Sequence, residues 1–368
     1  MTDSKKTTMA KDRRATASQS IYPVTEGRKQ CIKNVGFEDF AESIKEMGQP
    51  PYRATQIFDW IYKKNAGSFD DMSNLAQGFR AALDERYTVD ALKIEKTLVS
   101  TDGTKKFLYA LAGGGCIESV LIPDRGRITL CVSTQAGCAM GCAFCMTGKG
   151  GLKRSLDAAE ILDQVLIARR TIIETMSLSN IVFMGMGEPL ANYDEFLKAI
   201  RMLTDSMGVA MSPSRITFST AGLIELINKA ADEFPPVGLA VSLNATDDKL
   251  RSEIMPVAKG NPIKGIIDAA RGYSEKTGGE LTFEYVVLGG LNDSNAEARR
   301  LAALLRGVRC KVNLIAFNPF PGSKYARPAH AAVEAFRDEL KRRGIFVFMR
   351  RGRGGEIGAA CGQLGGEE

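Results

Sequence analysis

The sequence predicts an α/β protein built on a partial (βα)6 barrel of the TIM type, preceded by a small N-terminal helical accessory domain. From residue 127 onward, short strand-like runs alternate with helical stretches, a rhythm typical of parallel βαβ units. Between residues 37 and 87, apolar residues instead recur at three- and four-residue steps, which indicates helices. Six units are fewer than the eight of a closed barrel, so we expect one open side that admits a large substrate.

The composition is typical of a soluble globular chain with one large or two to three smaller domains: 44% of the 368 residues are hydrophobic and 25% are charged. The first twenty residues hold no apolar core, and no window approaches 18 consecutive apolar residues. We therefore expect neither a secretory signal nor a membrane span. Eight cysteines without an export signal indicate reduced thiols used for metal binding or chemistry, in the cytoplasm.

Residues 1–30 are predicted to be a basic flexible tail, with seven basic and three acidic residues. Such a tail is compatible with a solvated disordered segment or with an arm that follows nucleic-acid phosphates. Residues 31–91 form the helical accessory domain, which we expect to bind RNA. Ile57, Trp60 and Ile61 share one face of a predicted helix, and we expect that face in the core of this domain.

Residues 92–126 are predicted to be a short β-rich connecting segment, with three strand-like runs separated by glycines. Glu118 lies in the third run. A lone glutamate on a strand is usually exposed, so the pattern alone does not predict a catalytic role for it.

Residues 127–350 contain the predicted barrel. Its strand-like runs lie at 128–134, 180–185, 216–220, 239–244, 281–287 and 312–318, and a further run follows at 344–350. Ligands of such folds bind at the carboxyl ends of the parallel strands, so we expect the functional residues there.

The loop after the first barrel strand carries the spacing Cys138-x3-Cys142-x2-Cys145. Three thiolates at this spacing can hold a 4Fe–4S cluster and leave one iron without a protein ligand. The alternatives are buried structural thiols and a zinc site. Zinc requires a fourth ligand from elsewhere in the chain, and the candidates are Cys116, Cys131, Cys310, Cys361 and His330. The spacing, with Phe144 before the last cysteine, resembles the radical S-adenosylmethionine (SAM) superfamily, in which the open iron chelates the amino and carboxylate groups of SAM.

Polar residues follow the other barrel strands. Glycines such as Gly187 permit close backbone approach, and Glu188 can pair with the SAM ammonium. Serine and asparagine at strand ends can hold the SAM ribose and carboxylate, or can instead cap helices. The residues predicted to contact SAM are Gly187, Glu188, Ser219, Ser242, Leu243, Asn244 and Asn318.

Residues 351–368 form a Gly-rich C-terminal tail. Arg350, Arg351 and Arg353 can contact phosphates there, although a mobile polar tail is the simpler interpretation. Cys361 lies in this tail without a packing role, so its thiol is either incidental or reactive. Of the remaining cysteines, Cys31, Cys116 and Cys310 match no motif and are expected to be packing or incidental residues.

A set of longer motifs resembles the RlmN family, the radical SAM methyltransferases of adenosine C2. The motifs are LCVSTQAGCAMGCAFC, MGMGEPLANY, ITFSTAG, AVSLNA, IAFNPFPG, GAACGQL and, in the helical domain, YRATQIFDWIY. The resemblance extends from about Phe37 to Leu364. One departure is Asn244, where members of the family often have histidine.

The resemblance implies methylation of C2 of adenosine in 23S rRNA and in tRNA. Because C2 is an electron-poor amidine carbon, it does not attack the methyl group of SAM, and a radical route is needed. In this scheme Cys361 takes a methyl group from one SAM, and the cluster on the three loop cysteines cleaves a second SAM. The methyl-derived radical on Cys361 joins the base, Cys131 releases the product and leaves a disulfide, and Glu118 accepts the proton, alone or with Cys131.

The implied partners are 23S rRNA, tRNA and an electron donor such as a flavodoxin system, with no membrane partner, and we expect a monomer. The motifs do not separate C2 methylation from C8 methylation by the related Cfr enzymes. A non-catalytic iron–sulfur RNA-binding protein, and a radical enzyme acting on protein or small molecules, are further alternatives.

Overall fold

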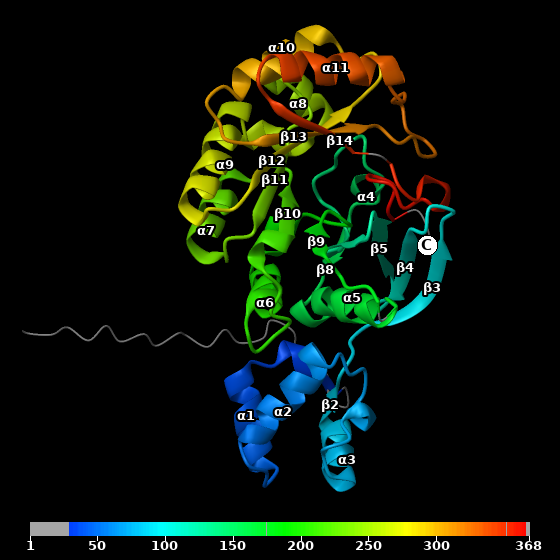
Figure 1. The fold of residues 1–368 in the computed structure, drawn as a ribbon, viewed down its shortest axis with the longest axis vertical. Helices are drawn as coiled ribbons and strands as arrows, with labels where there is room; N and C mark the ends of the chain where they lie inside the picture. The colour runs from blue at the N-terminus through cyan, green and yellow to red at the C-terminus, as the bar shows by residue number, and fades with distance from the viewer. Residues whose placement is uncertain (1–28, 174, 351, 366–368) are drawn as a thin grey trace, which may run out of the picture.

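The computed structural model describes residues 29–173, 175–350 and 352–365. A small helical unit lies at one end of a large curved sheet, which carries helices on its outer face (Figure 1). The predicted tail, residues 1–30, falls outside the described residues except for its last two positions. Among the described residues, no helix has the length and apolar character needed to cross a membrane.

In the helical unit, the second helix continues into a π-helical turn that changes which side chains face the core. It holds α1 (Phe37–Glu46), α2 (Tyr52–Phe58), η2 (Asp59–Lys63) and α3 (Gln77–Arg86), with the paired strands β1 (Gln30–Cys31) and β2 (Tyr87–Thr88). Ile57 and Ile61 are fully buried, as predicted. Trp60 is not, because the π turn alters the angular spacing of residues there. Its Nε1 instead donates a 2.6 Å hydrogen bond to Asn74 near the surface.

One ten-stranded sheet carries the rest of the chain, in the order β14-β13-β12-β11-β10-β9-β6-β5-β4-β3. The parallel strands are β6 (Arg127–Cys131), β9 (Asn180–Phe183), β10 (Ile216–Thr220), β11 (Gly238–Ser242), β12 (Leu281–Val287), β13 (Lys311–Ala316) and β14 (Phe346–Arg350). The antiparallel strands are β3 (Lys93–Val99), β4 (Lys105–Ala110) and β5 (Cys116–Asp124). The predicted α/β class is confirmed. The run at 344–350 adds a seventh parallel strand, and the 92–126 segment extends the same sheet.

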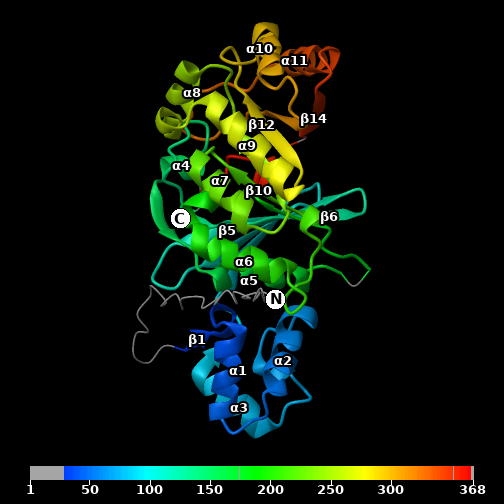
Figure 2. The same ribbon diagram turned by 90° about the vertical axis from the view of Figure 1, so that its left-hand side faces the viewer.

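The connecting helices cover the outer face of the parallel strands, and Figure 2 shows α6, α7 and α9 lying over them. The longer helices are α5 (Ala158–Arg170), α6 (Tyr193–Thr204), α7 (Ile224–Glu233), α9 (Ile263–Thr277), α10 (Asn295–Leu304) and α11 (His330–Arg342). The shorter elements are η1 (Ile32–Asn34), η3 (Phe69–Asp71), β7 (Gln135–Gly137), α4 (Met146–Lys149), β8 (Leu152–Ser155), η4 (Pro189–Asn192), η5 (Pro213–Arg215), α8 (Asp248–Ile254), η6 (Pro256–Gly260) and η7 (Gly355–Ile357).

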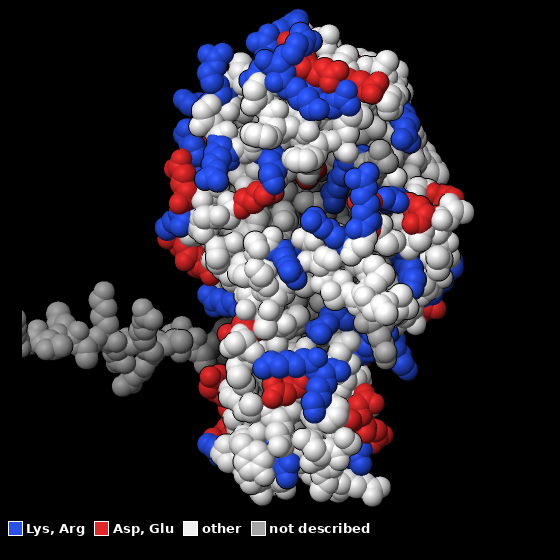
Figure 3. All heavy atoms as spheres, in the orientation of Figure 1, with Lys and Arg blue, Asp and Glu red and all other residues white. Residues whose placement is uncertain are grey.

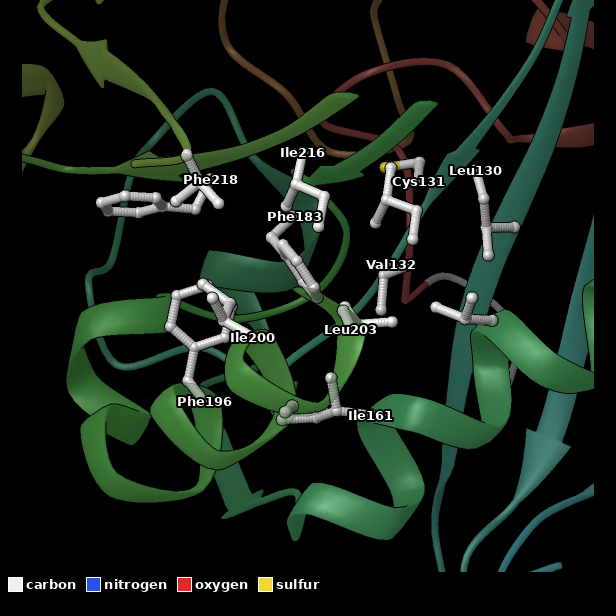
Figure 4. Packing of buried hydrophobic residues seen from close by; sticks show 14 of the residues in the cluster. Leu130, Cys131, Val132, Ile161, Phe183, Phe196, Ile200, Leu203, Ile216 and Phe218 are labelled. Atoms are coloured by element: carbon white, nitrogen blue, oxygen red, sulfur yellow. The ribbon is translucent and has the colours of Figure 1, made fainter. Parts of the chain in front are cut away.

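Alternate residues of each parallel strand face the helices and form the main core. Phe183 of β9 and Phe218 of β10 pack on Phe196 of α6, with ring centroids 4.8 and 5.8 Å apart (Figure 4). Thr217 and Ser219, which stand on either side of Phe218 in β10, are only partly buried. Because successive strand residues point to opposite faces, these two face the inside of the barrel, where a ligand can reach them.

Buried ion pairs join the helical unit to the barrel. The side chains of Lys33 and of Asp163 on α5 are fully buried and form an ion pair. Asp90 accepts 3.0 Å hydrogen bonds from Lys33 and from Arg170, also on α5. These contacts fix the orientation of the helical unit relative to the open barrel, since a buried charge cannot leave its partner cheaply.

Candidate active site

The three motif cysteines lie in one loop that a short hairpin closes at its base. Gly137 of β7 pairs with β8, and the Cys138 amide donates a 2.9 Å hydrogen bond to the Gly151 carbonyl. Gly137 has φ +76°, and a Cβ there would lie 1.9 Å from the Gly151 oxygen, so only glycine fits. Cys142 follows within the loop, and Cys145 precedes α4. The hairpin therefore brings the loop ends together beside the carboxyl end of β6.

The three thiols lie close enough to influence one another. Burial, together with the nearby Glu188 and Cys145, raises the pKa of the Cys138 thiol to about 11, against the opposing effect of a backbone hydrogen bond at Met140. Burial also raises the pKa of Cys142, to which the charges of Cys145 and Cys138 add. Apolar side chains surround the loop, among them Phe144, Met146, Met255, Phe317 and Phe320. Such thiols ionise readily only when a positive metal centre binds them.

This donor set fits a cubane cluster better than a single zinc ion. Among the described residues, no three His, Cys, Asp or Glu side chains converge on a point where one metal ion could be held. A cubane places its three ligands on three different irons, so its cysteines need not converge. His330, one possible fourth zinc ligand, lies instead at the start of α11, where its exposed Nδ1 is 3.2 Å from Oε2 of Glu334.

Contacts within the protein fix the conformation of the Gly187–Glu188 turn after β9. Gly187 has φ +97°, and a Cβ there would lie 2.5 Å from the Gln135 side chain. Both Glu188 oxygens accept backbone hydrogen bonds, from Leu190 at 3.1 Å and from Ala221 at 2.6 Å. Burial raises the Glu188 pKa to about 7, and these hydrogen bonds oppose the shift. The carboxylate therefore ties the ends of β9 and β10 together, and its remaining lone pairs stay available for a ligand cation.

The other predicted SAM contacts lie along the carboxyl ends of β10, β11 and β13. Ser219 and Ser242 are half-buried, whereas Leu243 and Asn244 are fully buried. Asn244 has φ +60°; its Oδ1 accepts a 2.8 Å hydrogen bond from Val286, and its Nδ2 lies 3.3 Å from the Met255 sulfur. The alternative of helix capping is wrong for these residues, because the neighbouring helices α7, α8 and α11 begin after Leu223, Asp247 and Ala329.

Two further thiols lie on segments that border the same mouth. Cys131 ends β6 at the border of the core cluster in Figure 4, and Cys361 is on the C-terminal segment. Burial raises the Cys131 pKa to about 12, and Arg350 lowers it while Cys361 raises it. Cys361 is exposed as a whole residue, yet protein surrounds its thiol, which raises its pKa to about 11 against the opposing effect of Arg350. All eight cysteines are free thiols in the structure.

The C-terminal segment is anchored across the mouth, so the interpretation as a mobile tail is wrong for residues 352–365 (Figure 1). The Met146 amide donates to the Gly362 carbonyl at 2.8 Å, and Asn318 Nδ2 donates to the Cys361 carbonyl at 3.4 Å. Further upstream, Arg353 pairs with Asp124 at 2.6 Å. These contacts hold Cys361 over the cysteine loop. Arg351 lies outside the described residues.

Glu118 is buried where the C-terminal segment attaches to the sheet, contrary to the expectation that a lone glutamate on a strand is exposed. Its Oε1 accepts a hydrogen bond from Lys106 of β4 at 3.1 Å, and its Oε2 accepts one from the Gly365 amide at 2.8 Å. Sequence reasoning missed Lys106, whose only signal was its position beside Glu118 on a neighbouring antiparallel strand. It also missed Glu284, an acidic residue in the otherwise apolar β12, which is a recognisable signal because parallel strands are normally apolar.

Lys and Arg side chains surround a hollow on the face of the molecule that carries this mouth, with few acidic side chains inside it (Figure 3). A concave basic surface of this kind attracts polyanions such as nucleic acids.

Two family models match the chain: the radical SAM superfamily over residues 132–302, and the ribosomal RNA large subunit methyltransferase N-terminal domain over residues 32–89. The chain is 46% identical to the dual-specificity RNA methyltransferase RlmN of Syntrophobacter fumaroxidans, covering 91% of this chain and 97% of the relative. It is 44% identical to the protein of the same name from Pelobacter propionicus, covering 92% and 96%. A crystal structure of a radical SAM methyltransferase from Sphaerobacter thermophilus matches with a TM-score of 0.89 at 42% identity, covering 92% of this chain and all of that chain.

Proposed function

Because the chain belongs to the RlmN family of radical SAM RNA methyltransferases, we propose that it methylates C2 of adenosine in 23S rRNA and in tRNA. The observation that carries the proposal is that two further thiols border the mouth where the three-cysteine loop lies: Cys131 ends β6, and Cys361 is on the segment whose Gly362 carbonyl accepts from Met146 in the loop. Ordinary methyl transfer from SAM needs no additional thiols, whereas an electron-poor carbon such as C2 needs a carrier that delivers the methyl group as a radical.

Cys361 is the proposed methyl carrier. Its thiolate attacks the sulfonium methyl of one SAM, a new S–CH3 bond forms, and S-adenosylhomocysteine leaves. The anchors at Asn318 and Met146 support this role because they hold the Cys361 backbone next to the cysteine loop. Arg350 supports it as well, since its positive charge favours the thiolate.

Cys138, Cys142 and Cys145 are the proposed ligands of a 4Fe–4S cluster. When bound there, the cluster would supply the electron for reductive cleavage of a second SAM, which makes a radical route to the Cys361 methyl group possible. We propose that Gly187, Glu188, Ser219, Ser242, Leu243, Asn244 and Asn318 contact SAM. Ser219 and Ser242 are accessible enough to bind its hydroxyl groups directly, whereas the buried Asn244 would act by shaping the turn after β11.

Cys131 is the proposed resolving thiol. Once the Cys361 methylene carbon is bonded to C2, the adduct gives up the C2 proton and one electron, which the cluster would accept when bound. The Cys131 thiolate then attacks Cys361 Sγ and the carbon–sulfur bond breaks. The freed carbon takes a proton, and a Cys131–Cys361 disulfide remains that an external thiol or reductase must reduce. The position of Cys131 at the end of β6, beside the mouth that the Cys361 segment crosses, supports this role.

Glu118 is the proposed acceptor of the C2 proton, alone or together with Cys131. The ammonium group of Lys106 lies 3.1 Å from its Oε1 and orients the carboxyl group that would accept the proton. Both groups are buried, so neither charge is screened by bulk water.

The proposed partners are 23S rRNA, tRNA and a one-electron donor of the flavodoxin type, with the enzyme acting as a monomer. The helical unit would hold the RNA, since its buried ion pairs with α5 keep it in a constant position relative to the barrel.

Nucleoside mass spectrometry tests the proposal. RNA from a strain lacking this gene is treated anaerobically with the reconstituted protein and SAM and is then digested. Formation of 2-methyladenosine supports the assignment, whereas 8-methyladenosine would assign the protein to C8 chemistry. Absence of both products, from enzyme whose cluster is intact, contradicts the proposed substrate.

A further inference from the structure

Glu284 of β12 holds an unsatisfied carboxylate oxygen inside the barrel. The residue is 4% exposed, and its Oε1 accepts a 2.9 Å hydrogen bond from Asn313 of β13. Its Oε2 is fully buried and has no hydrogen-bond partner among the described residues. Its neighbours Phe283 and Tyr285 belong to the core beneath the helices, so Glu284 faces the interior. A buried acceptor without a donor destabilises the fold, and a ligand that donates to it would remove that cost.

Arg350 faces the same space from β14, the edge strand that β13 separates from β12. Its neighbour Met349 packs against the core, so Arg350 points inward. Its guanidinium reaches the Met184 sulfur, just beyond β9, at 3.2 Å. Burial raises the pKa of Glu284 and the positive charge of Arg350 opposes that rise, yet no ion pair of 4.0 Å or less joins the two side chains. A polar, planar ligand that reaches both side chains could donate to the unpartnered Glu284 oxygen and accept from the Arg350 guanidinium.

The chemistry of the pair selects the group. The Glu284 oxygen needs an N–H donor, and Arg350 offers N–H donors to an acceptor. Adenine presents both on adjoining positions, an exocyclic amino group and ring nitrogens. Arg350 also interacts with Cys131 and Cys361, the thiols that the proposed reaction places at the base. Ser242 lies beside Glu284 in register, and it is a proposed SAM contact.

We propose that Glu284 and Arg350 bind an adenine base inside the barrel, with Glu284 accepting from the exocyclic amine and Arg350 donating to a ring nitrogen. The inference rests on the proposed function, which brings two adenines to this mouth: that of the target nucleotide and that of SAM. The position of Arg350 beside both thiols favours the target adenine.

The test compares RNA carrying adenosine at the target position with RNA carrying purine riboside, which lacks only the amino group. Binding and methylation of both RNAs are measured for the reconstituted wild type, Glu284→Ala and Glu284→Gln. The wild type should prefer adenosine by about 10- to 100-fold, as expected for a hydrogen bond to a charged group. Glu284→Ala should reduce that preference to about one, as in a double-mutant cycle. Because glutamine has nearly the same shape as glutamate, Glu284→Gln allows the adenosine preference to be measured if the alanine variant folds poorly.

A second arm measures the affinity of the same variants for S-adenosylhomocysteine. Weaker binding there, with the adenosine preference unchanged, would place the adenine of SAM in the site. The control is Glu280→Ala, which removes an exposed partner of Lys311 from the neighbouring turn and should change neither quantity. If Glu284→Ala alters neither the adenosine preference nor S-adenosylhomocysteine affinity, the inference is overturned. Because RNA binding is measured separately, this outcome is distinguishable from methylation at another carbon.

Discussion

The backbone amide of Gly365 donates a 2.8 Å hydrogen bond to the Glu118 carboxylate, across a sequence separation of 247 residues. The proposed base thus also anchors the segment that carries the proposed methyl carrier, Cys361. Because Glu118 has both roles, it links the position of the Cys361 thiol to the position of the proposed proton acceptor.

Two substitutions of Glu118 should separate these duties. Glu118→Gln keeps an acceptor for the Gly365 amide but loses the base, whereas Glu118→Leu loses both. We expect both variants to lose about 10²- to 10⁴-fold in methylation rate. Only Glu118→Leu should increase hydrogen exchange at residues 361–365. Full activity in Glu118→Gln would show that Glu118 is an anchor and not a base.

Cys361→Ala should abolish methylation, with a loss of at least about a thousandfold, while the cluster stays intact. Iron content and the visible absorbance of the reconstituted protein check the cluster. Cys310→Ala, which removes a partly buried thiol just before β13, is the matched control and should retain activity. Loss of iron in Cys361→Ala, or retention of activity, would contradict the carrier role.

Cys131→Ala should stop the reaction after the base has joined Cys361, because the neighbouring thiol Cys145 is a proposed cluster ligand and is not available to attack that sulfur. Denaturing gels of the reaction should then show RNA covalently attached to protein, and Cys131→Ala/Cys361→Ala should show none. Free methylated RNA at the wild-type rate from Cys131→Ala would rule out the resolving role.

Lys33→Met should destabilise the protein by about 3–5 kcal/mol, because it leaves the fully buried Asp163 carboxylate without its cation. Urea unfolding measures the change in free energy. Lys45→Met removes a lysine from an exposed pair with Glu42 and should cost no more than about 1 kcal/mol. Equal effects of the two variants would mean that the Lys33 pair does not hold the helical unit to the barrel.

Local patterns predicted the elements well. The run predicted at 216–220 is β10 to the residue, and the run predicted at 312–318 begins and ends within two residues of β13. The cysteine spacing likewise predicted a single loop after the first barrel strand. Both signals depend on residues close in sequence, where periodicity and turn chemistry act directly.

Long-range contacts were not predictable in the same way. The burial of Glu118 depends on Lys106 across an antiparallel pair and on Gly365 near the C-terminus. The anchoring of Cys361 depends on Asn318 and on the loop at Met146. A Gly-rich composition predicts mobility because it carries no information about such distant acceptors, and only the folded chain brings them together.

The mass of the transferred methyl group tests the central claim most directly. With SAM whose methyl group is fully deuterated, the Cys361 route removes one deuterium before the carbon joins the base. When the carbon–sulfur bond breaks, a proton replaces it, so the methyladenosine should carry two deuterium atoms. A methyl group that arrives with all three deuterium atoms would contradict the account, because it would have passed to RNA without a methylene stage on Cys361.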